Sequence, residues 1–100
     1  MMSNMDRIIR EEARLVLLAA LAAQADRTLN SELLRAELDA VGIRRTRAFV
    51  DVELSHLADI GAVTLAAYGE VRIATLTQTG LDHVERRALL PGVKRPAPLA

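Results

Sequence analysis

The segment between Gly42 and Gly80 constrains the fold of this chain more than any other part of the sequence. Within it, Val50, Leu54 and Leu57 recur at helical spacing, and this pattern predicts the buried face of a helix. Two short stretches that alternate apolar with polar residues follow, and then the start of another helix. We therefore expect a helix, a two-stranded ribbon and a second helix in direct succession.

The ribbon has a recognisable turn and a recognisable end. Residues 63–65 and 71–73 alternate at period two, and Tyr68-Gly69 between them supplies turn chemistry, so this part predicts a β-hairpin. Thr77 is a good N-cap, and a last helix is expected from there to about Leu90.

Two more helices are expected before this segment. The first is predicted over Asp6–Gln24, with Asp6 as its N-cap. The second is predicted from Asn30 or Ser31 to about Val41, and a minimal strand is expected at Thr28-Leu29 between the two.

The run from Leu15 to Ala23 is apolar on every side of the first helix. A helix of that kind has to be covered on more than one side, so we expect a second copy of the chain to pack there as a homodimer. Its nine residues are far fewer than the roughly 20 that a membrane-spanning helix needs. No membrane contact is therefore expected, and the default location is the cytoplasm.

Composition limits the classes of function that remain. One hundred residues predict one domain, which we place at residues 6–90 between a disordered start (1–5) and an extended basic tail (91–100). The chain has no cysteine, and neither His56 nor His83 has partners at metal-ligand spacing. There is no Gly-rich phosphate loop and no nucleophile beside a base. We therefore expect no enzyme activity, no cofactor and no metal.

The predicted elements together have the order of a winged helix-turn-helix, a mainly α-helical fold with a small β-hairpin. The pattern Leu54-x-x-Leu57-x-x-x-Gly61-x-Val63, followed by Leu76-Thr77-x-x-Gly80, resembles the winged-helix domains of bacterial regulators of the MarR, ArsR and PadR type. The segments 42–47 (Gly-Ile-Arg-Arg-Thr-Arg) and 91–96 (Pro-Gly-Val-Lys-Arg-Pro) are also similar to small winged-helix proteins of Mu-like prophages. The regulator resemblance implies DNA binding and control of transcription. Gly42 lies twelve residues before Leu54, a longer spacing than these regulators have, so base-reading positions do not carry over by count.

The predicted DNA-contacting residues lie at the start of the third helix, on its exposed face and on the ribbon. Arginine forks match phosphate oxygens and guanine edges, and small apolar side chains meet thymine methyl groups. The predicted site comprises Arg44, Arg45, Thr46, Arg47, Ala48, Val52, Ser55 and Arg72. The alternative is a solvated turn in which Arg47 pairs with Asp51 four residues on.

Two functions remain open on these residues. The first is a small homodimeric DNA-binding protein that regulates transcription from double-stranded DNA. The second is a protein–protein adaptor, for example in phage assembly or packaging. The second is favoured by the balance of thirteen basic and thirteen acidic residues and by a ribbon whose only base is Arg72. The basic tail is expected to be a nucleic-acid arm, a partner-binding peptide or a solvated end, and Tyr68 either an exposed anchor or a cover for the hairpin.

Overall fold

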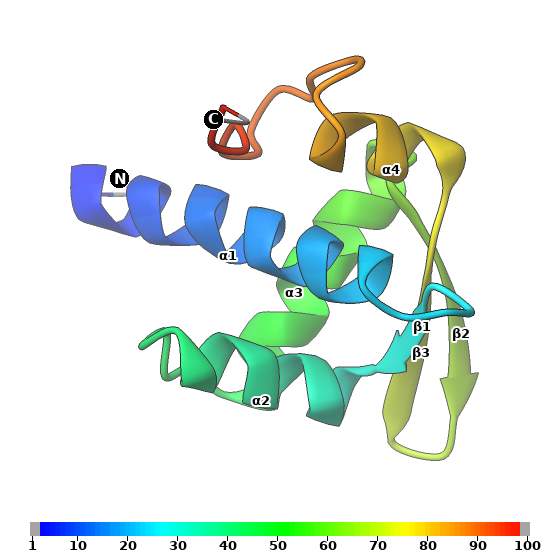
Figure 1. Ribbon diagram of the computed structural model, residues 1–100. Helices are drawn as coiled ribbons and strands as arrows, with labels where there is room; N and C mark the ends of the chain where they lie inside the picture. The colour runs from blue at the N-terminus through cyan, green and yellow to red at the C-terminus, as the bar shows by residue number, and fades with distance from the viewer. Residues whose placement is uncertain (1–2, 99–100) are drawn as a thin grey trace.

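The computed structural model describes residues 3–98, in which helices pack against one antiparallel sheet (Figure 1). Four helices and one three-stranded antiparallel sheet are found in this part of the chain. In chain order the elements are α1 (Asn4–Ala22), β1 (Thr28–Asn30), α2 (Ser31–Ala40), α3 (Arg47–Asp59), β2 (Val63–Tyr68), β3 (Val71–Leu76) and α4 (Gln78–Val84).

Helix α1 begins earlier than its sequence suggests. Ser3 is the N-cap, and its hydroxyl accepts the backbone N–H of Asp6 at 3.0 Å. The prediction of Asp6 as the cap was therefore wrong, because the cap lies three residues before the acid. Residues 3–5, which we expected to be disordered, form the cap and first turn, whereas the rest of that predicted segment lies outside the described residues.

The apolar run of α1 is covered by the same chain. Leu17, Leu18 and Leu21 are fully buried, and α1 packs against α2, α3, α4 and β3. Figure 1 shows α1 crossing the middle of the domain, with other helices around it. The argument that a second copy must cover Leu15 to Ala23 therefore loses its basis.

The sheet has the strand order β1-β3-β2. Strand β3 is central; it pairs with β2 from Val63↔Leu76 to Tyr68↔Val71, and with β1 through Thr28↔Thr75. The hydroxyl groups of Thr28 and Thr75 lie 3.0 Å apart, which fixes this register. The minimal strand expected at Thr28-Leu29 is confirmed as β1, and its pairing with β3 makes the predicted two-stranded ribbon part of a three-stranded sheet.

The core forms where the helical spacing placed it. Val50, Leu54 and Leu57 of α3 are fully buried, as predicted. Gly61 follows α3 with a φ of +80°, a conformation that favours glycine and lets the chain turn into β2. The last helix ends at Val84 and not near Leu90, because a left-handed residue, Arg86, follows its C-cap.

The described part of the tail, residues 91–98, has no regular structure but is not free. Val93 is buried against the core, and the backbone N–H of Lys94 donates to the carbonyl oxygen of Glu11 on α1 at 3.1 Å. The tail therefore lies as a strap along α1, and it packs without any partner.

Candidate nucleic-acid interface

The predicted arginine cluster lies at the start of α3. Arg44 and Arg45 are exposed in the connection before the helix, and Arg47 is its first residue. Thr46 is the N-cap, and its hydroxyl accepts the backbone N–H of Phe49 at 3.2 Å. Since a helix carries positive partial charge at this end, the three guanidinium groups and the helix present charge of the same sign.

Two contacts orient these arginines. The guanidinium carbon of Arg45 lies 5.9 Å from the centre of the Phe49 ring, within the range of a cation–π interaction. Arg47 lies 4.0 Å from the carboxylate of Glu70, in the turn between β2 and β3. The start of α3 and the tip of the ribbon are therefore side by side. No ion pair between Arg47 and Asp51 is found within residues 3–98.

The exposed face of α3 is short of polar groups. Ala48 and Val52 are exposed, with Val52 57% accessible. Asp51 is half-buried, and its Oδ1 has no hydrogen-bond partner among the described residues. This face therefore offers apolar contact more than hydrogen bonds.

Ser55 and Arg72, which the sequence placed on separate elements, meet in the structure. The Arg72 guanidinium donates to Ser55 Oγ at 2.7 Å, and the Arg72 backbone N–H donates to Ser31 Oγ at 3.1 Å. A hollow of about 250 Å³ lies beside Arg72 on the ribbon, lined also by Leu65, Ala66 and Ala67. Arg72 therefore ties the ribbon to α3 and is not a free base at the tip.

Tyr68 is exposed to solvent, whereas the basic tail is partly bonded to the rest of the chain. Tyr68 is 77% exposed at the end of β2, so it does not cover the hairpin. Of the tail bases, Lys94 pairs with Glu12; just before the tail, Arg86 donates to the carbonyl oxygen of Pro96 at 2.7 Å and Arg87 pairs with Glu85. These contacts leave the tail with less free charge than its composition suggested.

A buried ionic cluster was missed by the sequence reasoning. Glu53 of α3 is fully buried, and Arg14 of α1 donates to its Oε1 at 2.7 Å. Arg14 also donates to the carbonyl oxygen of Gly92 in the tail at 2.7 Å. Glu53 lies three residues after Val50 and four before Leu57, and this spacing already assigns it to the buried face.

His83 is the second buried polar group that holds the tail. Its Nδ1 accepts the backbone N–H of Leu90 at 2.9 Å, so the proton is on Nε2, which donates to the carbonyl oxygen of Lys94 at 2.9 Å. Both histidine nitrogens are thereby occupied. Over residues 3–98 no group of three potential metal ligands is found.

The first turn of α2 adds an acid near the arginines. Glu32 accepts two hydrogen bonds from Arg35, at 2.7 and 3.0 Å, and this bonding lowers the pKa of Glu32 from its ordinary value. Burial opposes this and raises the pKa, and the charges of Arg35 and Arg47, which have smaller effects, lower it further. The same pairing raises the pKa of Arg35.

The fold is that of a small α+β domain with one arginine-rich helix end. The chain is similar to the uncharacterized protein gp26 of Escherichia phage Mu, with 37% identity over 93 residues that cover 93% of this chain and 96% of that protein. It therefore belongs to the family of this phage protein, which confirms the phage part of the predicted resemblance. No protein-family model matches the chain, and no solved structure matches it, so the comparisons give no support to a relation with the MarR, ArsR and PadR regulators. None of the helices described is long and apolar enough to cross a membrane.

Proposed function

We propose that this protein binds double-stranded DNA through the start and exposed face of α3, within a winged helix-turn-helix domain. The order α1-β1-α2-α3-β2-β3 and the strand order β1-β3-β2 support this proposal. In that architecture α2 and α3 form the helix-turn-helix, and the β2–β3 ribbon is the wing beside the recognition helix.

One observation carries the proposal, and it is the arrangement at the start of α3. Arg44, Arg45 and Arg47 gather at the positive end of a helix whose next exposed positions are Ala48 and Val52. Guanidinium groups bind phosphate oxygens there, and the aliphatic side chains fit the methyl groups of thymine. Regulation of transcription would follow from sequence preference at this face.

The balance of charge is compatible with such a site. Outside α3, many arginines are paired within the chain, as Arg14 is with Glu53, Arg35 with Glu32 and Arg87 with Glu85. Arg44 and Arg45 are left exposed, so a chain of zero net charge still presents basic groups at the start of α3. The proposal needs no second copy of the chain.

The test is a duplex-binding assay on a variant in which Arg44, Arg45 and Arg47 are all replaced by Ala, with Thr46 kept so that the cap remains. We expect binding to weaken by at least a factor of ten, because even one lost hydrogen bond to a charged group contributes on the order of that factor. Replacement of Arg35 and Arg87 by Ala is the matched control, because it removes exposed charge elsewhere. Equal affinity of the triple variant and the wild type would refute the assignment.

A protein-binding adaptor of a phage particle is the second candidate. Val52 and Tyr68 are large, exposed apolar groups near α3 and the ribbon, and Arg72 is already bonded to Ser55. A Val52→Glu, Tyr68→Ala double variant that folds and binds duplex normally, yet fails in particle assembly, would favour the adaptor.

A further inference from the structure

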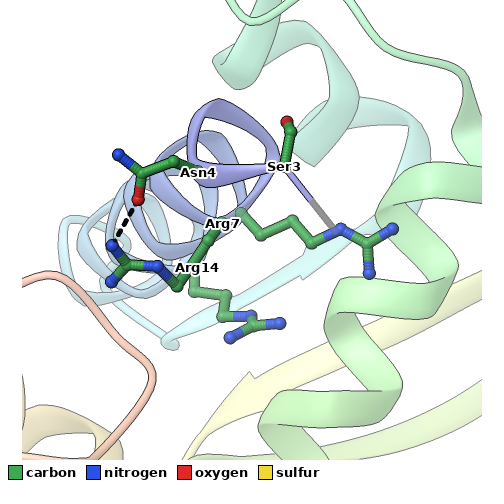
Figure 2. Close-up of a pocket in the computed structure, with 5 residues that line it drawn as sticks. Ser3, Asn4, Arg7 and Arg14 are labelled. Carbon is green, nitrogen blue, oxygen red and sulfur yellow. Dashed lines mark hydrogen bonds between the residues drawn. The ribbon is translucent and has the colours of Figure 1, made fainter. Parts of the chain in front are cut away.

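A cavity of about 510 Å³ opens at the N-terminal end of α1. The exposed face of α3 does not line this cavity. The cavity is lined by Ser3, Asn4, Arg7, Arg10 and Arg14 (Figure 2). The three arginines are spaced i, i+3 and i+7, so they lie on one face of the helix. This spacing brings three guanidinium groups to one opening.

The three side chains lie at different depths. Arg7, Arg10 and Arg14 are 60%, 38% and 12% exposed, so they run from the rim to the floor of the cavity. At the rim, Arg7 donates to Asn4 Oδ1 at 2.7 Å (Figure 2). Arg7 also lies 3.6 Å from the carboxylate of Glu11. At the floor, Arg14 is held by its hydrogen bonds to Glu53 and Gly92. Arg7 and Arg14 are therefore both anchored.

Arg10 is the member whose donors are not used. Its guanidinium lies 3.9 Å from Glu53 Oε2, an ion pair beyond hydrogen-bond distance, and it makes no side-chain hydrogen bond within residues 3–98. The hydrogen bond to Glu53 comes from Arg14 instead, at 2.7 Å, and Glu53 is not among the residues that line the cavity. The cavity thus holds an arginine with free N–H groups between two that are anchored.

We propose that this cavity binds a phosphate group. A guanidinium fork matches phosphate oxygens, and the fork of Arg10 lies between two anchored guanidinium groups, Arg7 and Arg14, that add positive charge. The N-terminal end of the 19-residue helix α1 adds positive partial charge, and Asn4 adds an amide donor at the rim. The source of the phosphate is either the free ion or a nucleic-acid strand. The site uses none of Arg44, Arg45 and Arg47, so it stands whether or not α3 binds DNA.

The test is a ¹H–¹⁵N NMR titration of the whole chain with inorganic phosphate, at constant ionic strength set with sodium chloride. We expect saturable shifts in the backbone amides of Asn4 and Met5 and in the Nε–H of Arg10. In Arg10→Ala the affinity should fall about tenfold, since a charged hydrogen bond contributes on that order. Arg35→Ala, which removes an exposed arginine from α2, should bind phosphate as the wild type does.

A second variant protects the result against a folding defect. Arg7 is largely exposed, so Arg7→Ala should fold normally and still bind phosphate more weakly than the wild type. If neither variant changes the affinity, or if no saturable shift occurs with any probe, the proposal is overturned.

A second pair of probes identifies the source of the phosphate. A short single strand with a 5′-phosphate and the same strand without it are titrated beside the inorganic ion. Shifts at Asn4 and Arg10 with the inorganic ion support the free-ion source, and shifts with the strands alone support nucleic acid. Failure of the α3 proposal is seen separately, as unchanged duplex binding when Arg44, Arg45 and Arg47 are replaced.

Discussion

Replacing Gly80 with alanine tests how α4 is seated on the sheet. Gly80 is buried in the first turn of α4, where an added Cβ would run into the carbonyl oxygen of Ala62 and lie 2.6 Å from Leu76 Cδ1. The Leu76 side chain can rotate away. The carbonyl of Ala62 has less freedom, because it accepts the backbone N–H of Thr77 at 3.1 Å, and the Thr77 hydroxyl also donates to Gly61 at 2.6 Å.

Two opposing effects set the size of the change. Alanine favours a helix over glycine by about 1 kcal/mol, whereas forcing a methyl group into a packed contact costs about 1–3 kcal/mol. Because the obstacle is backbone, we expect the clash to win and the free energy of unfolding to fall by about 1–2 kcal/mol. The melting temperature should fall by about 4–8 °C for each kcal/mol in a domain of this size.

Urea denaturation followed by circular dichroism measures this change, with Thr79→Ala as the control. Thr79 is exposed in the same helix turn, so its replacement should change the free energy of unfolding by less than about 0.5 kcal/mol. A Gly80→Ala protein as stable as the wild type, or more stable, would refute the close approach of α4 to Ala62.

The buried ionic cluster and an exposed pair give two more predictions. Glu53→Ala leaves the guanidinium of Arg14, which is 12% exposed, without its carboxylate, and should lower the free energy of unfolding by about 3 kcal/mol. Urea titration checks this value, and a loss below about 0.5 kcal/mol would contradict it. Glu32→Gln should be less stable than the wild type at neutral pH, because bonding to Arg35 lowers the pKa of Glu32 from 4.5. That stabilisation is present above the ordinary pKa and is lost as the pH falls through the lowered one, so melting temperatures of the two proteins should converge in acid. A constant difference across this range would show that the carboxylate charge is not its cause.

The sequence predicts α3 and the ribbon well because their signals are local. Val50, Leu54 and Leu57 mark one helix face, and Thr77 caps α4 with its own hydroxyl, which accepts the N–H of Gly80 at 3.1 Å. Such signals act within a few residues, so a single sequence contains them.

The features that were missed depend on contacts between distant segments. The tail packs because Val93 is buried and Lys94 bonds to Glu11, which lies more than 80 residues earlier. Likewise, α1 is covered by elements that are spread along the chain: α2, α3, α4 and β3. The apolar run does not show which elements cover it, so it suggested a dimer. Periodicity shows that a face is buried, but it does not show which partner buries it.

The DNA-contacting role of the candidate site stays a prediction. Arg44 and Arg45 directly precede α3, Arg47 begins it, and Ala48 and Val52 are exposed on it. Ser55 and Arg72 were assigned separate roles, and only the folded chain shows that they bond to each other. The arginines of α1 were overlooked, although their i, i+3 and i+7 spacing is readable in the sequence.

The salt dependence of duplex binding tests the DNA-binding account most directly. If Arg44, Arg45 and Arg47 neutralise three phosphates, the slope of log affinity against log salt should be about −2.7, which weakens binding about 40-fold between about 50 and 200 mM salt. Fluorescence anisotropy of the wild-type protein with a random duplex pool measures this slope. Binding that weakens by that factor is the predicted result. No binding at the lower salt concentration, or binding that does not change with salt, would contradict the account.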